Sequence, residues 1–293
     1  MLKLLAALLF ASGIVMAQPV TVPLIVEGNA ATVELELSSA SGIRKARFLV
    51  DTGGNDALIF GSRLMADIGA QATGPVSKGA LPTVPLKSVP VKLGGMALDL
   101  TGVRTIGTPG RRRFRVRNDI EGLIPGRLLR NYEVIFDYPA RSFTLARPGA
   151  TEPRGIKVKT PISSPGCFPR IELKIGGVTY GFLLDTGASF TMIGRPALER
   201  WAKANTAWPA ATGAVGFANM FGGKIESEAL MLRIAEIGIG AISLKDVAAV
   251  SRPKGNFEKF SRGMTAPIIG ALAGSRGRAL KNTFMHVGTG TMS

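Results

Sequence analysis

Two apolar segments of this chain end in the same three residues, Asp-Thr-Gly. The first segment, FLVDTGGNDALIF, begins at Phe48, and the second, FLLDTGASFTMIG, begins at Phe182. The two aspartates, Asp51 and Asp185, lie 134 positions apart (185 − 51). Each follows a Gly turn and a short apolar run. A pattern written twice predicts two similar halves, because two copies are too few for a stacked repeat array.

A second pair of similar segments supports the duplication. The first half contains EGLIPGRLLRNYEVIFDY and the second contains APIIGALAGSRGRALKN. We match Gly126 with Gly270, 144 positions apart (270 − 126). The segment RPGATEPRG, rich in Pro, Gly and charge, separates the halves. We therefore expect an N-terminal lobe over residues 18–150 and a C-terminal lobe over residues 155–293.

The residue pattern within each half indicates mostly β-structure. TVELEL and RIELKI alternate apolar and polar residues, as half-buried strands do. The runs FLV and FLL are continuous and apolar, which is typical of strands buried on both faces. Only RPALERWAKA has a clear helical pattern, with Pro near its start. The sequence predicts an all-β protein with a few short helices.

Two carboxylates delivered by such strands can perform acid–base chemistry. A single buried Asp would be costly, because burial disfavours its charge. Two facing Asp side chains can share one proton, because they cannot both ionise easily at short range. The ionised partner can then take a proton from water, while the neutral partner donates to a substrate carbonyl oxygen. This arrangement suits hydrolysis of an amide bond without a covalent intermediate.

These motifs resemble those of the aspartic proteases, in particular the retropepsin-like ones. FLLDTGASFTMIG followed by PIIGALAG is similar to the retropepsin pattern, and FLVDTGGND followed by GLIPGRLLRNYEVIFDY resembles it in the first half. Two tandem copies imply a single-chain, pepsin-like architecture of two β-barrel lobes. The resemblance implies that Asp51 and Asp185 form the catalytic pair and that Thr52 and Thr186 interlock the two turns. The supporting turn residues are Thr52, Gly53, Thr186 and Gly187.

The chain also departs from the family pattern. Gly54 stands where retropepsins usually have Ala, and Pro125 interrupts the first apolar-apolar-Gly run. TGAVGFANMFGGKIESEALML, from Thr212, is the better candidate for a flap over substrate, and GPVSKGALPTVPLKSVP, from Gly74, is the less clear one. The second half has only NTFMHVGTGTMS as a closing strand. These features leave open a catalytically idle module that holds an extended peptide by strand addition.

The N-terminal segment predicts export. Residues 1–17 combine an early Lys, an apolar core and Val-Met-Ala, which is typical of a cleaved signal peptide. We expect a mature chain from Gln18 that is periplasmic or secreted, soluble and monomeric, with a protein or peptide as substrate. A retained membrane anchor is the alternative interpretation.

The remaining chemistry-bearing residues favour no other function. The net charge is +16 and is densest in RRRFRVR, Arg111 to Arg117, which we interpret as a solvated loop or protected edge strand and not as a nucleic-acid site. His286 and Cys167 are the only residues of their types. Ser251 and Lys254 fit a Ser-x-x-Lys pattern, but Pro253 argues against a shared helical turn. We expect no cofactor and no metal, because nucleotide-binding motifs and metal-ligand clusters are absent.

Overall fold

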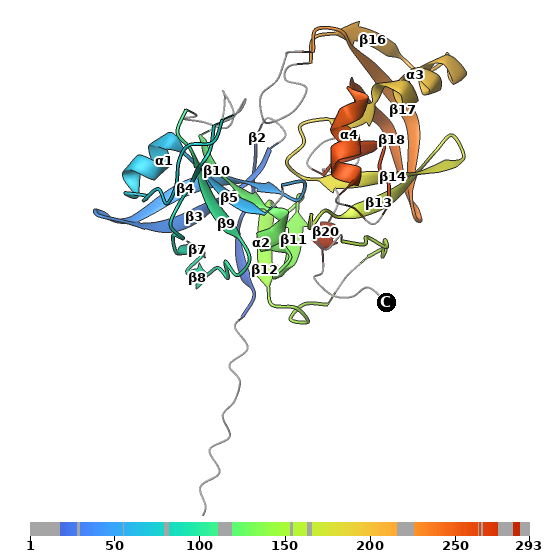
Figure 1. Ribbon diagram of the computed structural model, residues 1–293. Coiled ribbons are helices and arrows are strands. Elements are labelled where there is room, and N and C mark those ends of the chain that lie inside the picture. Colours follow the sequence, from blue (N-terminus) through green and yellow to red (C-terminus); the bar gives the residue numbers. More distant parts are fainter. Residues whose placement is uncertain are drawn as a thin grey trace, which may run out of the picture.

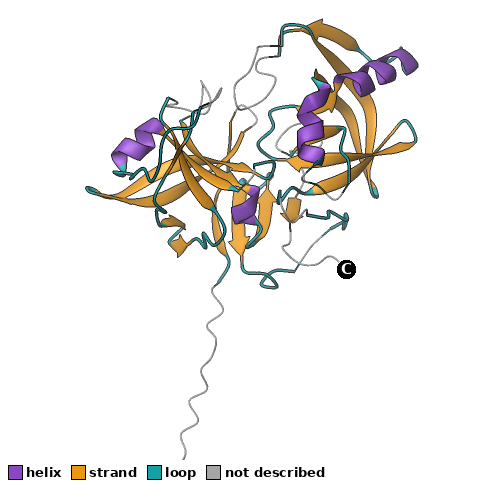
Figure 2. Cartoon of the chain, viewed as in Figure 1, coloured by secondary structure: helices purple, strands orange, loops and turns teal. Residues whose placement is uncertain are grey.

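The computed structural model describes most of the chain from Gln18 onward. It covers residues 18–27, 30–54, 56–78, 82–110, 119–152, 155–162, 166–215, 226–262, 264, 266–274 and 284–287. Strands dominate this part, and its helices are few and short (Figure 2). In Figure 1 the strands of the first half and those of the second half form two separate groups, with β11, β12 and β20 between them. The predicted fold class, a duplicated two-lobed all-β architecture, is confirmed.

The first half is built around an open sheet in the order β6-β9-β5-β10-β4-β3-β7-β8, with β2 added to β3. Its elements are β2 (Ile25–Glu27), β3 (Ala30–Ser39), β4 (Gly42–Asp51), β5 (Ala57–Gly61), α1 (Ser62–Asp67), β6 (Val84–Pro85), β7 (Val91–Leu93), β8 (Met96–Ala97), β9 (Arg104–Thr108), β10 (Ile120–Pro125) and α2 (Gly126–Leu129).

The second half is a closed barrel. Its sheet runs β13-β14-β19-β15-β18-β17-β16, and a pairing of Lys174 with Gly238 joins β13 back to β17, so that six strands form a ring. The elements are β13 (Arg170–Ile175), β14 (Val178–Asp185), β15 (Thr191–Gly194), α3 (Arg195–Ala204), β16 (Ala210–Gly213), β17 (Ala229–Ile239), β18 (Ile242–Arg252), α4 (Lys254–Ser261) and β19 (Gly270–Ala273). The predicted strand RIELKI and helix RPALERWAKA coincide with β13 and α3.

A third sheet joins the two halves. It has the order β1-β12-β11-β20, with β1 (Val20–Pro23), β11 (Glu133–Asp137), β12 (Ser142–Ala146) and β20 (Phe284–Val287). Three of its strands belong to the first half, and β20 comes from the C-terminal end and pairs antiparallel with β11. The C-terminal part of the second half therefore adds one edge strand to a shared sheet.

Both halves place the Asp-bearing strand in the same local topology. β10 lies parallel to β4 and antiparallel to β5. In the second half β19 lies parallel to β14 and antiparallel to β15. This repetition confirms the duplication. Strand propensity alone does not lead two unrelated segments to the same combination of one parallel and one antiparallel neighbour.

The pairing register corrects the match between the later segments. Phe48 pairs with Gly122, and Phe182 pairs with Gly270, so the counterpart of Gly270 is Gly122 and not Gly126. Gly126 corresponds instead to Gly274. The match of Gly126 with Gly270 was wrong by four residues, because Leu-Ile-Pro-Gly and Pro-Ile-Ile-Gly look alike when the strand partners are not considered.

The two equivalent glycines have the same packing role. A Cβ atom on Gly122 would lie 2.1 Å from the Phe48 ring, and one on Gly270 would lie 2.5 Å from the Phe182 ring. Both rings are fully buried, each in the main apolar core of its own half. Each half thus buries an aromatic side chain of the strand that carries its aspartate, and glycine on the neighbouring strand makes room for the ring.

Candidate active site

Each aspartate is the last residue of a buried strand. β4 delivers Asp51 and β14 delivers Asp185, and each pairs with the end of a parallel strand, at Pro125 and Ala273. Asp51 is 2 % exposed, whereas Asp185 is only partly buried. The two carboxyl groups are hydrogen-bonded to each other. Residues 134 positions apart in the sequence therefore meet in one place, as the sequence predicted.

The glycines of the two turns allow this approach. A Cβ atom on Gly53 would lie 2.5 Å from Asp185 Cγ, and one on Gly187 would lie 2.5 Å from Asp51 Cγ. These distances are far below van der Waals contact, so a side chain at either position would overlap the carboxyl group of the opposite half. Each turn therefore needs glycine so that the carboxyl group of the opposite half can fit against its backbone.

The threonines interlock the two turns with near two-fold symmetry. The Thr52 N–H donates to Thr186 Oγ1 (3.0 Å), and the Thr186 N–H donates to Thr52 Oγ1 (3.0 Å). The Thr52 hydroxyl donates to the Leu184 carbonyl (2.7 Å), and the Thr186 hydroxyl donates to the Val50 carbonyl (2.7 Å). Both threonines are buried, so these four bonds are shielded from water. The structure brings Thr52 and Thr186 together as the family resemblance implied.

Backbone amides support the carboxyl groups. The N–H groups of Gly187 and Ala188 both donate to Asp185 Oδ1, at 2.8 and 2.9 Å. The N–H groups of Gly53 and Gly54 donate to Asp51. Gly54, which departs from the usual family residue, thus occupies the position of Ala188. A Cβ atom there would lie 3.1 Å from the Asp51 carbonyl oxygen, which is tight.

The environment of Asp51 favours its protonated form. Burial raises the pKa of Asp51 well above its usual range, and the negative charge and hydrogen bond of Asp185 raise it further. The amides of Gly53 and Gly54 lower this pKa in part, because they stabilise the ionised form. The pair can therefore hold one proton and one negative charge at a pH where ordinary carboxyl groups are both ionised.

Pro125 does not disturb the packing behind Asp51. It ends β10 opposite Asp51, at the position of Ala273, and it precedes the first residue of α2. Gly126 N–H donates to the Gly54 carbonyl, and Gly274 N–H donates to the Asp185 carbonyl, so both turns are tied to the strand behind them.

Both candidate flap segments belong to hairpins. β16 and β17 pair antiparallel from Ala210–Leu232 to Gly213–Ala229, and the Val215 N–H donates to the Glu226 carbonyl. In the first half, the Thr73 N–H donates to the Pro85 carbonyl and the Ser77 N–H donates to the Thr83 carbonyl. The tips, residues 79–81 and 216–225, lie outside the described residues.

The other sequence candidates lie on other elements or outside the described residues. Ser251 is fully buried at the end of β18, where its Oγ accepts from the Leu230 N–H, and Lys254 begins α4, so the two do not share a helical turn. His286 lies on β20. The Arg111–Arg117 segment lies outside the described residues. Within the described residues, no cluster of three His, Cys, Asp or Glu side chains could hold a metal ion.

Cys167 has a structural role that its sequence position does not reveal. It is buried, in a left-handed backbone conformation (φ 54°). Its carbonyl oxygen lies against Gly126, and its Sγ accepts hydrogen bonds from Arg127 (3.4 Å) and Arg130 (3.8 Å). The segment between the halves thus packs behind the first aspartate turn. No local pattern could have indicated this, because the contact depends on where the segment crosses α2.

Two homologous turns that interlock through threonine and pair their carboxyl groups define a two-lobed fold of the acid-protease class. The family model of aspartyl proteases matches residues 171–271, a segment that includes Asp185, Thr186 and Gly187. Over this segment of the second half the match bears out the predicted resemblance to the aspartic proteases, and it supports aspartic protease function in general. No curated protein sequence matches the chain. Among the helices described, none has the length and apolar character needed to cross a membrane.

Proposed function

We propose that the protein is an aspartic endopeptidase in which Asp51 and Asp185 activate a water molecule for attack on a peptide bond. The observation that carries this proposal is the hydrogen-bonded carboxyl pair, held by four reciprocal threonine bonds. Such a pair has both groups that general acid–base hydrolysis requires, one ionised and one protonated.

The roles of the two carboxyl groups follow from their surroundings. Asp51 is the more deeply buried and holds the shared proton in the free enzyme, so that it donates to the carbonyl oxygen of the substrate. Both carboxyl groups accept two amide N–H groups, but Asp185 is partly exposed, so its negative charge costs less than that of the buried Asp51 would. Asp185 therefore acts as the base that takes the proton from water. We expect peptide hydrolysis to be strongest on the acid side of neutral pH. At higher pH the shared proton is lost, and the pair then has no acid to donate to the substrate carbonyl oxygen.

The protein is exported and acts outside the cytoplasm, with the mature chain beginning near Gln18. The motivation is the charge and apolar pattern of residues 1–17. N-terminal sequencing of the protein recovered from the periplasm or medium of an expressing bacterium tests this. A start at Met1 in the membrane fraction would contradict it.

The catalytic proposal is tested with Asp51→Asn and Asp185→Asn. Asn keeps the shape and can hydrogen-bond, but it cannot take a proton from water. The purified chain from Gln18 is incubated with a mixed peptide library between acid and neutral pH. Each variant should lose hydrolysis by about a thousandfold or more, and the double variant should be no worse, because the two residues act as one unit.

Two results would change the conclusion. Equal cleavage by the wild type and both variants would mean a contaminating protease and would refute the catalytic role. Retention of peptides without cleavage by any of them would favour the alternative, a peptide-binding module of the same fold.

A further inference from the structure

A short segment, residues 167–169, contacts both halves of the protein next to their aspartate turns. Towards the first half, a Cβ atom on Gly126 would lie 3.2 Å from the Cys167 carbonyl oxygen. Towards the second half, the Pro169 carbonyl oxygen accepts the N–H of Leu184 (2.9 Å), the residue before the second aspartate. We call residues 167–169 the bridging segment, because it links the surroundings of the two turns over a short path.

On the side of the first half, Gly126 lies between the bridging segment and the first turn. The Gly126 N–H donates to the Gly54 carbonyl (3.1 Å). A Cβ atom on Gly126 would also lie 3.0 Å from the Thr52 carbonyl oxygen and 3.1 Å from that of Gly54. Gly54 donates its own N–H to Asp51. The bridging segment therefore packs against the first turn through one glycine, at the point where that turn supports its carboxyl group.

Two arginines contact the Cys167 thiol on this side. Cys167 Sγ accepts from Arg127 Nη1 (3.4 Å) and Arg130 Nη1 (3.8 Å), which lie in α2 and at its C-terminal cap. The left-handed backbone conformation of Cys167 is one that residues other than glycine rarely adopt. A residue keeps such a conformation only where its surroundings fix it. The contacts of the thiol with the arginines therefore help to hold the Cys167 carbonyl oxygen against Gly126.

The other two residues of the bridging segment belong to the second half. The Phe168 ring packs edge-on against the Phe260 ring, with the centroids 5.2 Å apart, in an apolar cluster of that half. Leu184, whose N–H donates to Pro169, accepts the Thr52 hydroxyl at its own carbonyl oxygen (2.7 Å). Leu184 is thus bonded to the bridging segment through its N–H and to the first turn through its carbonyl group.

The bridging segment makes the two halves different at this place. The strand register makes Pro169 the counterpart of Ala31, and the chain from its antiparallel partner to Pro169 is longer than the one that leads to Ala31. Gly274 is the counterpart of Gly126, and the three atoms nearest to a Cβ on Gly274 all belong to Thr186, in its own half. The contact from the other half is thus found at Gly126, behind the more deeply buried aspartate.

We propose that the bridging segment positions the first aspartate turn against the second, and that Cys167 fixes it there. Cys167 is a positioning residue, because it acts on Asp51 through Gly126 and Gly54. The effect on catalysis rests on the proposed function, whereas the effect on the two turns does not. A shift of the first turn would alter the hydrogen bond between the carboxyl groups, and a misplacement of about 1 Å in such a geometry lowers a rate by about a hundredfold.

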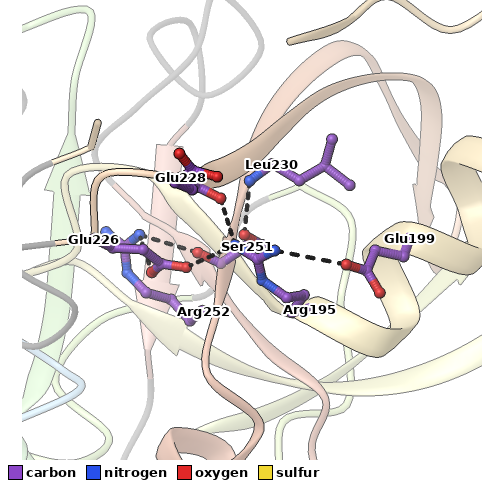
Figure 3. Close-up of polar contacts among 7 residues, drawn as sticks. All are labelled: Arg195, Glu199, Glu226, Glu228, Leu230, Ser251 and Arg252. Atoms are coloured by element: carbon purple, nitrogen blue, oxygen red, sulfur yellow. Dashed lines mark hydrogen bonds and ion pairs between the residues drawn. The ribbon is translucent and has the colours of Figure 1, made fainter. Parts of the chain in front are cut away.

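The test is Cys167→Ala, with Ser251→Ala as the matched control. Each substitution removes one buried side-chain atom that accepts a hydrogen bond. Ser251 Oγ accepts the Leu230 N–H (2.9 Å), and both residues lie in the second half (Figure 3). Next to Ser251 are ion pairs that also join elements of the second half, formed by Arg195, Glu226 and Arg252 (Figure 3). The control therefore perturbs the interior of one half and leaves the bridging segment intact.

Cys167→Ala should speed amide hydrogen exchange at Leu184 and Thr52 by about tenfold or more, because both N–H groups bond where the halves meet. For a cleaved peptide, kcat should fall about tenfold or more, with KM within about twofold. Cys167→Ser, which keeps an acceptor for the arginines, should recover most of the loss. Ser251→Ala should leave these exchange rates and kcat within about twofold of the wild type. All rates are measured well below the melting temperature, so that loss of folded protein does not lower them.

Arg127→Gln keeps the test decisive if Cys167→Ala does not fold. Arg127 is only partly buried, and the variant removes one of the two donors to the thiol, so exchange and kcat should change in the same direction by a smaller factor. Unchanged exchange at Leu184, or a loss of kcat no larger than that of Ser251→Ala, would overturn the proposal. So would a Cys167→Ser variant as slow as Cys167→Ala. If the wild type cleaves no peptide, the proposed function fails, and the exchange rates still decide whether the bridging segment holds the turns.

Discussion

The Thr186→Val substitution tests the interlock of the two halves. Val has nearly the same shape as Thr but has no hydroxyl group. The Thr186 side chain is fully buried, donates to the Val50 carbonyl at 2.7 Å and accepts from the Thr52 N–H at 3.0 Å. The substitution would leave one backbone acceptor and one backbone donor without partners in the interior.

The cost follows from these two lost bonds. Each buried backbone group left unpaired costs about 1–3 kcal/mol. Some relaxation of the turn reduces the sum, so we expect Thr186→Val to lower the free energy of unfolding by about 2–4 kcal/mol. Thr52→Val should cost about the same, because the bonds of Thr52 mirror those of Thr186. The double variant should cost less than the sum, because the two residues share partners.

Urea denaturation followed by fluorescence measures this free energy, with peptide hydrolysis recorded in parallel. Thr144→Val is the matched control, because the Thr144 hydroxyl bonds to Thr21 in an exposed position. We expect the control to change stability by less than about 0.5 kcal/mol. Thr186→Ser, which keeps the hydroxyl, should recover most of the loss. A Thr186→Val variant as stable as the control would refute the argument that these bonds hold the halves together.

Two further predictions concern the carboxyl pair. The pKa of Asp51 is raised in the folded state. The Asp51 carboxyl group therefore contributes fully to stability below its pKa in the unfolded chain, about 3.9, and this contribution is lost as the pH rises through its pKa in the folded protein. Asp51→Asn should therefore be more stable than the wild type at pH 7 in thermal unfolding, and this difference in stability should disappear near pH 3. A difference that does not vary with pH would contradict this reasoning. Gly187→Ala places a Cβ atom 2.5 Å from Asp51 Cγ and should abolish peptide hydrolysis, whereas Gly255→Ala, with open space around its Cβ position, should retain it.

Local sequence was sufficient where the chain repeats itself. The Asp-Thr-Gly turns, the strand RIELKI and the helix RPALERWAKA were all predicted at or near their observed positions. These segments carry their own signals, because a strand alternates with period two and a helix beginning with Pro has a recognisable start. The division into residues 18–150 and 155–293 and the export of the chain stay predictions.

The register of the later segments could not be predicted from local sequence. Leu-Ile-Pro-Gly resembles Pro-Ile-Ile-Gly, and this likeness led to the match of Gly126 with Gly270. The decisive fact is the contact of a Phe ring with Gly122 in one half and with Gly270 in the other, which is a property of neighbouring strands. Side-chain pattern alone leaves such a strand's partner undefined.

What the sequence by itself determined is a duplicated β-protein with two aspartates at equivalent strand ends, since repetition and alternation are visible along the chain. Only the tertiary structure decided that the two carboxyl groups share a hydrogen bond, that each fits against the glycine of the other half, and that Arg195 and Arg252 enclose Glu226. These contacts join residues far apart in the chain. Their geometry depends on how sheets pack and cross, and this is set by the whole fold and by no single segment.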